Sequence, residues 1–427
     1  MIKIYDMETL EEREILFRGG SGADVSAPVA EILRAVQERG DAALREYTLR
    51  FDGAAPDALA VTAEEVDQAA AQVEPAFLAV LEEAAEHIRA YHARQKRESF
   101  VMTEREGVVL GQRIIPLARV GIYVPGGTAA YPSTVLMNAI PARIAGVGEI
   151  IMVTPPGRDG AVNPHILAAA KIAGVTRIYK VGGAQAVAAL AYGTGTIPQV
   201  DKIVGPGNAY VAEAKRQVFG RVNIDMIAGP SEVLVLADGR SNPAWVAADL
   251  LSQAEHDRMA AAVMVTDSSP LAEAVAHELA RQLAALPRAE IARASLEANG
   301  KLIVCRDLRE GIAVANRIAP EHLELCVDNP FDYLGEIQNA GSVFLGRYNP
   351  EPMGDYFAGP NHTLPTMGTA RFYSPLSVDD FVKKSQFSYY TRDALARDYR
   401  KVSLFARKEG LDAHARAVDI RFEGGEA

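Results

Sequence analysis

The chain has 427 residues, more than one compact core usually holds, so at least two packed units are expected. Hydrophobic residues make up 49% of it and charged residues 23%, which is the balance of a globular protein and excludes a disordered or fibrous one. A formal net charge of −11 argues against a surface for nucleic acid or for an anionic membrane.

The first residues and the cysteines narrow the setting further. Residues 1–13 carry four acidic side chains without the basic and apolar regions of a secretion signal, and no window is apolar for long enough to span a membrane. Cys305 and Cys326 form no CxxC pair, which excludes a thiolate zinc site and a disulfide framework. We therefore expect a cytoplasmic protein.

The first hundred residues are predicted to be helical. Thr62 and Glu65 form a capping box, and Glu74-Pro75 places a proline at the first position of a second helix. Apolar residues from Phe77 to Tyr91 then recur at spacings of three and four, as on one face of a helix.

From Arg119 onward, short apolar runs alternate with helical stretches. The predicted strands are 120–124, 149–154, 177–181, 202–204, 233–236, 262–266, 302–305 and 342–345. The predicted helices between them are 133–145, 164–174, 184–191, 243–255, 271–286 and 311–318. This alternation predicts right-handed βαβ units and largely parallel sheets, and its two runs indicate a pair of related α/β lobes. After Pro375 the chain is predicted to be helical again (377–384 and 394–411), in a tail that packs on a neighbour.

Three groups of histidine and carboxylate are candidates for chemistry. Gln253 and His256 lie at i and i+3 on a helix, where both could reach one ion, although His256 could equally cap the helix end. Glu321-His322 follows Pro320, which favours an extended Ala319 and a turn at this pair. The turn could supply an acid and a base whose pKa values are shifted apart by their environments, or it could be a solvated turn without a role.

The third group lies in a loop rich in glycine and proline, which carries Asp355 and His362, and such loops are more often functional than filler. His414 alone would be a surface histidine, and a plain surface or helix-end role is expected for His87 and His92. Taken together, Gln253, His256, Asp355 and His414 offer nitrogen and oxygen donors without sulfur, which suits Zn²⁺, Mn²⁺ or Co²⁺.

Glycine-rich turns mark a second candidate site. Pro125-Gly126-Gly127, Gly182-Gly183 and Gly205-Pro206-Gly207-Asn208 each follow a predicted strand and precede a helix. Helix N-termini at the carboxyl edge of a parallel sheet bind anionic groups such as pyrophosphate, but the chain has neither GxGxxG nor a P-loop. The clustering of these turns favours a ligand crevice without naming its ligand.

Six stretches resemble one family closely, namely that of the histidinol dehydrogenases. They are 120–148 (beginning VGIYVPGG), 201–210 (DKIVGPGNAY), 224–257 (including GPSEVLVLAD and SQAEHD), 319–325 (APEHLEL), 354–366 (GDYFAGPNHTLPT) and 409–414 (EGLDAH). The resemblance covers roughly residues 30 to 420.

The resemblance implies an enzyme that oxidises L-histidinol to L-histidine, the last step of histidine biosynthesis, with two NAD⁺ and one Zn²⁺ per site in a homodimer. It implies that Zn²⁺ and substrate are bound by Gln253, His256, Asp355 and His414, with His414 supplied by the partner subunit. It further implies substrate contacts from Ser231, His322, His362 and Glu409, and dinucleotide contacts from Tyr123, Gln185 and Asn208.

The fold that the resemblance implies is α/β, with two incomplete Rossmann-like lobes and small helical extensions at both ends. The expected division is an N-terminal arm (1–20), a first lobe (21–122 with 233–376), a second lobe (123–232) and a C-terminal helical tail (377–427) that reaches the partner subunit.

The expected mechanism is a hypothesis built on these residues. His322 takes the hydroxyl proton during the first hydride transfer, and Glu321 activates a water on the bound aldehyde, giving a gem-diol that His322 deprotonates during the second. Competing hypotheses are a related zinc- and NAD-dependent dehydrogenase of another small amino or sulfonated alcohol, a metal-dependent hydrolase, and a non-catalytic nucleotide-binding protein.

Overall fold

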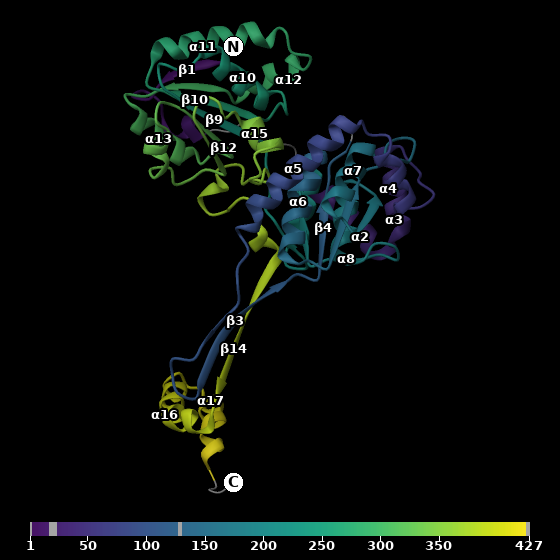
Figure 1. Ribbon diagram of the computed structural model, residues 1–427, viewed down its shortest axis with the longest axis vertical. Helices are drawn as coiled ribbons and strands as arrows, with labels where there is room; N and C mark the ends of the chain where they lie inside the picture. Colours follow the sequence, from purple (N-terminus) through teal and green to yellow (C-terminus); the bar gives the residue numbers. More distant parts are fainter. Residues whose placement is uncertain (1, 17–23, 127–129, 424–427) are drawn as a thin grey trace. The chain divides into compact units, whose positions relative to one another are not determined.

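The computed structural model describes residues 2–16, 24–126 and 130–423, so Gly127 of the first glycine turn and part of the predicted arm 1–20 lie outside it. The described chain divides into two compact units, residues up to 96 with 117–381, and residues 97–116 with 382 onward. The first unit holds two parallel sheets flanked by helices, which confirms the predicted α/β fold (Figure 1). Within the described ranges, no helix combines the length and apolar character needed to cross a membrane.

The larger sheet is built from the second run of βα units. Its strand order in the described residues is β1-β11-β10-β9-β12-β13, with every neighbouring pair parallel. The strands are β1 (Lys3–Asp6), β9 (Glu232–Ala237), β10 (Ala261–Thr266), β11 (Lys301–Val304), β12 (His322–Cys326) and β13 (Ser342–Leu345). The accompanying helices are α1 (Glu12–Leu16), α10 (Pro243–Ala254), α11 (Ser269–Leu283), α12 (Ala289–Ala298), α13 (Leu308–Ile318), α14 (Phe331–Leu334) and α15 (Glu351–Tyr356). Strand β12 was not predicted from the sequence.

The smaller sheet follows the first run. Among the described residues its order is β6-β5-β4-β7-β8, again parallel. The strands are β4 (Arg119–Tyr123), β5 (Glu149–Thr154), β6 (Arg177–Lys180), β7 (Lys202–Val204) and β8 (Asn223–Ile224). The helices between them are α6 (Pro132–Ala145), α7 (Pro164–Ala173), α8 (Gly183–Tyr192) and α9 (Ala209–Val218).

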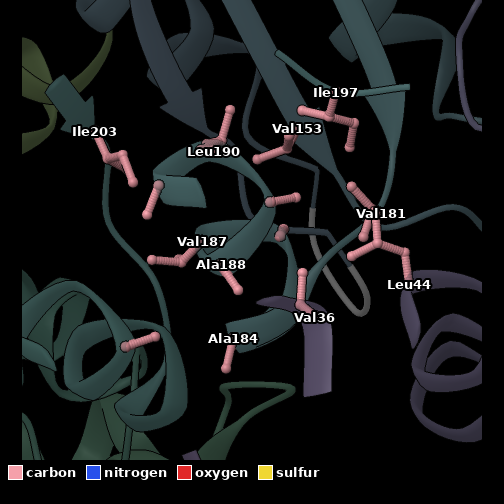
Figure 2. Close-up of a cluster of buried hydrophobic side chains, with 14 of the residues drawn as sticks. Val36, Leu44, Val153, Val181, Ala184, Val187, Ala188, Leu190, Ile197 and Ile203 are labelled. Carbon is pink, nitrogen blue, oxygen red and sulfur yellow. The ribbon is translucent and has the colours of Figure 1, made fainter. Parts of the chain in front are cut away.

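A dense core surrounds α8. This helix consists largely of alanine with valine and leucine, and residues 184–191 are all buried, so neighbouring elements approach it closely. Figure 2 shows Val187 and Leu190 of α8 among side chains from both sides, including Val36 and Leu44 from the N-terminal helices and Val153 from β5. Burying each such valine or leucine contributes about 1.5–3 kcal/mol.

The N-terminal helices pack on this smaller sheet, whereas the expected division joined 21–122 to residues 233–376. They are α2 (Ser26–Arg39), α3 (Asp41–Asp52), α4 (Ala63–Ala70) and α5 (Pro75–Ala93). Helices α2 and α3 contact α8, and α4 and α5 contact α7 and α6. The apolar faces of amphipathic helices show that the helices are covered, but not which sheet covers them. The remaining boundaries of the expected division stay a prediction.

The second unit corrects the prediction of a wholly helical tail. Residues 377–384 are not a helix: after the short 3₁₀ helix η2 (Val378–Phe381), strand β14 (Val382–Tyr390) pairs antiparallel with β3 (Val108–Pro116), which also pairs with β2 (Phe100–Met102). The unit continues with α16 (Arg392–Lys408), α17 (Asp412–Asp419) and η3 (Ile420–Phe422). Another 3₁₀ turn, η1 (Thr369–Arg371), belongs to the first unit.

Candidate active site

Glu321 and His322 lie where α13 turns into β12. The prediction of an extended Ala319 is wrong: Ala319 has φ 51° and is the left-handed C-cap of α13, with its N–H bonded to the carbonyl of Ala315. Glu321 is only 6% exposed and His322 only 4%, so the pair does not form a solvated turn. The chain therefore buries an acid and a base side by side.

The backbone of Glu232, at the start of β9, orients both groups. Its N–H donates to Oε2 of Glu321 at 2.9 Å, and its carbonyl accepts a hydrogen bond from Nδ1 of His322 at 2.9 Å. Because a carbonyl only accepts, Nδ1 carries the proton, and the lone pair of the neutral ring is on Nε2. Nε2 is buried and has no hydrogen-bond partner among the described residues.

Burial also sets the charge state of this pair. Desolvation lowers the pKa of His322 below its ordinary value and raises the pKa of Glu321 well above the usual range of a glutamic acid. His322 is therefore neutral near pH 7, with a free nitrogen that can accept a proton.

Two carboxylates of α15 face this nitrogen. Nε2 of His322 lies 3.9 Å from Oε1 of Glu351 and 3.9 Å from Oδ1 of Asp355. One ligand atom from each of these three residues lies within 4.8 Å of the others, a spacing that could hold a metal ion. Burial raises the pKa of Asp355 and raises that of Glu351 to about 7. Sequence reasoning missed Glu351, although its i, i+4 spacing from Asp355 after Pro350 was an available signal.

Helix α10 borders the same cluster. Gln253 is 1% exposed and its Oε1 has no hydrogen-bond partner within the described part of the chain. Oγ of the preceding Ser252 lies 3.4 Å from Oε2 of Glu351, which joins α10 to α15. His256, just beyond the helix, acts electrostatically to lower the pKa of both Glu351 and His322. Asp355 and His256 thus lie near His322, whereas a common site with Gln253 stays a prediction.

His362 completes the buried group. Its Nδ1 donates to the carbonyl of Asp355 at 3.0 Å and lies 3.9 Å from the Oδ1 atom of that residue. Desolvation lowers the pKa of His362 to about 4, so this ring is also neutral near pH 7. His322, Asp355 and His362 line a cavity of about 70 Å³.

His92 supports the loop that carries Asn361 and His362. His92, near the end of α5, is buried, and its Nδ1 donates to the carbonyl of Ile88 at 2.9 Å. Its Nε2 lies 3.3 Å from Nδ2 of Asn361, which also donates to the carbonyl of Met137 at 2.6 Å. His92 therefore has the expected position at a helix end but is not on the surface, because polar neighbours along the helix do not show which elements cover it.

The remaining predicted contacts are less enclosed. Ser231 is half-buried just before β9, and its carbonyl accepts the N–H of Ala261. Glu409 and His414 belong to the second unit, where both are exposed and line a groove with Phe405 and Leu411. Their participation in the cluster stays a prediction.

The smaller sheet has a topological switch point at its carboxyl edge, which is where a ligand crevice is expected. Its chain order reverses between β4 and β7, and Tyr123 ends β4 while Gly205 follows β7. The hydroxyl of Tyr123 accepts the N–H of Gly183 at 3.0 Å, and burial raises the pKa of Tyr123 to about 12. Gln185 is 1% exposed, and both atoms of its amide group have no hydrogen-bond partner among the described residues. Asn208 caps α9 by accepting two backbone N–H groups.

The corresponding edge of the larger sheet is filled by an ion-pair network. Arg347, after β13, contacts Asp238, after β9, at 2.5 Å and Asp328, after β12, at 2.6 Å. Arg240 also pairs with Asp328. Side chains therefore occupy the switch point of this sheet, whereas at the smaller sheet the corresponding position has glycine turns and an unpartnered amide.

These features define a class, namely an α/β protein with two parallel sheets and a buried cluster of acid and base groups. A family model described as histidinol dehydrogenase matches residues 18–422. Curated histidinol dehydrogenases from Listeria monocytogenes serotype 4b and Geobacillus kaustophilus are 55% and 58% identical over 416 and 398 residues. These alignments cover 97% of both chains for the first and 93% of this chain and 94% of the relative for the second.

The fold agrees with a solved relative. The crystal structure of histidinol dehydrogenase from Elizabethkingia anophelis has a TM-score of 0.94 at 40% identity, covering 99% of this chain and 98% of that one. The chain belongs to the histidinol dehydrogenase family and is an oxidoreductase of histidine biosynthesis.

Proposed function

We propose that the protein oxidises L-histidinol to L-histidine in two successive steps, each coupled to reduction of one NAD⁺, through a bound aldehyde. The first step converts the alcohol to the aldehyde, giving NADH and a proton. The second adds water to the aldehyde and oxidises the gem-diol to the carboxylate, giving a second NADH and two further protons. We further propose a cytoplasmic homodimer in which His414 of the partner subunit completes each site.

The observation that carries this proposal is the unpartnered Nε2 of His322 within a cluster shielded from water. The hydrogen bond from Nδ1 to Glu232 holds the ring in the tautomer that a general base needs, and the lowered pKa keeps it unprotonated. His322 would accept the hydroxyl proton in each step. The raised pKa of Glu321 makes its ionised carboxylate a stronger base, which suits activation of water at the aldehyde stage.

The donor set fits Zn²⁺. Gln253 has a buried amide oxygen without a partner, Asp355 has a buried carboxylate, and His256 supplies an imidazole beside them. With the partner's His414 they would give nitrogen and oxygen ligands only, which Zn²⁺ accepts. When bound, the metal supplies a Lewis acid that fixes and polarises the substrate. Ser231, His362 and Glu409 would contact substrate.

The crevice of the smaller sheet fits a dinucleotide. The unpartnered amide of Gln185, the N-terminus of α9 at Asn208 and the end of β4 at Tyr123 supply donors and a turn without bulky side chains. When bound, NAD⁺ supplies the hydride acceptor.

A stoichiometric assay tests the proposal. NADH is followed at 340 nm while a limiting amount of L-histidinol is consumed, with and without a chelator. We expect two NADH per histidinol, and loss of activity after chelation that Zn²⁺ restores. A ratio of one, or full activity after verified removal of metal, would contradict the double oxidation or the metal requirement respectively.

A further inference from the structure

A buried ion pair lies beside Gly205, the residue that follows β7 in the smaller sheet. Lys215 on α9 and Asp225 just after β8 form a salt bridge in which their side chains are only 3% and 1% exposed. Neither residue is among those expected to contact the dinucleotide. A buried pair of this kind is costly to desolvate and is not in itself a source of stability. Its role is therefore to be found in its contacts with the neighbouring backbone.

Both partners bind backbone groups of the same residue, Gly205. Nζ of Lys215 donates to the carbonyl of Gly205 at 3.0 Å, and the N–H of Gly205 donates to Oδ2 of Asp225 at 2.8 Å. The ion pair therefore occupies both backbone polar groups of one glycine. Because hydrogen bonds to charged groups are stronger than those between neutral groups, the orientation of this glycine is fixed from both sides.

Gly205 is the residue that brings the turn against β4. Its φ is +110°, and a Cβ atom there would lie 2.2 Å from the carbonyl oxygen of Tyr123. Only glycine allows this approach, and glycine is also the residue with the least conformational restraint of its own. The turn that separates Tyr123 from Asn208 therefore depends on external contacts for its shape.

The turn ends at Asn208, whose side chain is held in one orientation by two hydrogen bonds. Oδ1 of Asn208 accepts the N–H groups of Tyr210 and Val211, each at 3.1 Å, so its amide nitrogen is the group that remains to donate. A rotation at Gly205 would move Asn208 and the start of α9 relative to Tyr123. A dinucleotide that contacts both sides of the crevice would lose part of its contacts.

We propose that Lys215 and Asp225 are positioning residues for the dinucleotide site. Together they hydrogen-bond both backbone polar groups of Gly205 and so set the distance between the Tyr123 and Asn208 sides of the crevice. This inference rests on the proposed function, since it takes the crevice as the place where NAD⁺ binds. It predicts a selective effect on dinucleotide affinity with the substrate cluster unchanged.

The test uses two neutral double variants, so that no uncompensated charge remains buried. K215M/D225N keeps an amide oxygen for the N–H of Gly205, whereas K215M/D225L removes both contacts. Binding of NAD⁺ to the purified full-length protein is measured by calorimetry, and the Michaelis constants for NAD⁺ and L-histidinol are measured separately. We expect about tenfold weaker NAD⁺ binding for K215M/D225L, a smaller loss for K215M/D225N, and an L-histidinol constant within twofold of wild type.

A second ion pair, at the start of the strand that leads to Gly205, is the matched control. Lys202, at the start of β7, pairs with Asp380 at 2.8 Å with the lysine side chain 4% exposed, at the end of the strand away from Gly205. K202M/D380N should lose stability comparably in chemical denaturation but keep wild-type NAD⁺ affinity.

The outcomes separate the inference from the proposed function. Equal NAD⁺ affinity in wild type and in folded K215M/D225L overturns the positioning role, as does an equal loss in K202M/D380N. If K215M/D225L does not fold, K215M/D225N decides alone, and unchanged NAD⁺ affinity there overturns the inference. If wild type itself binds no NAD⁺ and reduces none, the proposed function fails first and the positioning role fails with it.

Discussion

Replacing His322 by asparagine should remove the base while keeping the hydrogen bond that orients it. In the wild type, Nδ1 of His322 lies 2.9 Å from the carbonyl of Glu232. The side-chain nitrogen of asparagine can take the place of Nδ1 and donate to the same carbonyl. Nothing in asparagine reaches the position of Nε2, the buried atom that faces Glu351 and Asp355. H322N therefore separates the chemistry of the ring from its structural contact.

The expected magnitude follows from these contacts. A positioned general base is worth about 10²–10⁴ in rate, or about 3–5 kcal/mol of activation free energy, and both oxidation steps should lose it. The smaller buried side chain should cost only about 1–2 kcal/mol of unfolding free energy, because the bond to Glu232 remains.

Single-turnover formation of NADH, started from L-histidinol and separately from the aldehyde, measures the two steps. Chemical denaturation and NAD⁺ calorimetry on the same preparation show whether the fold and the crevice are intact. If folded H322N with wild-type NAD⁺ affinity carried out either step within tenfold of wild type, the assignment of His322 as the base of that step would be refuted.

Three further predictions concern other residues. E321Q keeps an amide oxygen for the N–H of Glu232, so it should fold normally and slow the aldehyde step at least about a hundredfold, lowering NADH per histidinol from two towards one; a wild-type aldehyde rate would remove Glu321 from that role. G205A should lose about 2 kcal/mol or more of unfolding free energy in chemical denaturation, because its Cβ collides with the Tyr123 carbonyl at positive φ, and a loss below 0.5 kcal/mol would contradict this. Burial raises the pKa of Asp52 from its ordinary 3.8 to about 6, so the free energy of unfolding falls as pH rises from about 4 to 6. After allowance for solvent screening, D52N should stabilise the protein by about 1–2 kcal/mol at pH 8 but not at pH 4. Equal effects of D52N at both pH values would show that its charge is not the cause.

The alternation of strands and helices was predictable because parallel strands buried on both faces are short apolar runs bounded by glycine and proline. The strand at 149–154 has the predicted bounds for this reason, and the half-buried edge strand at 342–345 also has its predicted bounds. Strands β3 and β14 were missed because they pair with each other across some 270 residues, and β14 is mostly exposed, so no local apolar run marks it. Antiparallel pairing between distant segments leaves no periodic signal in either one alone.

The candidate site was predictable in its residue types but not in its assembly. Asp355 lies beside His322, and Ser252 of α10 contacts Glu351 of α15, because α10, α15 and β12 come together in the fold. Residue spacing along the chain does not predict this tertiary arrangement. The start of β12 was read as a turn because Pro320 precedes it, whereas Ala319 absorbs the bend in a left-handed conformation.

The order of strands has a consequence for synthesis on the ribosome. The smaller sheet is complete once residue 224 has emerged, but β1 at the N-terminus is an edge strand whose partner β11 is made almost three hundred residues later. At about 5–20 residues per second, the nascent chain exposes β1 unpaired for on the order of half a minute. β3 waits some 270 residues for β14, so a ribosome that stalls before residue 301 leaves the smaller sheet complete and both β1 and β3 open to chaperones or to aggregation.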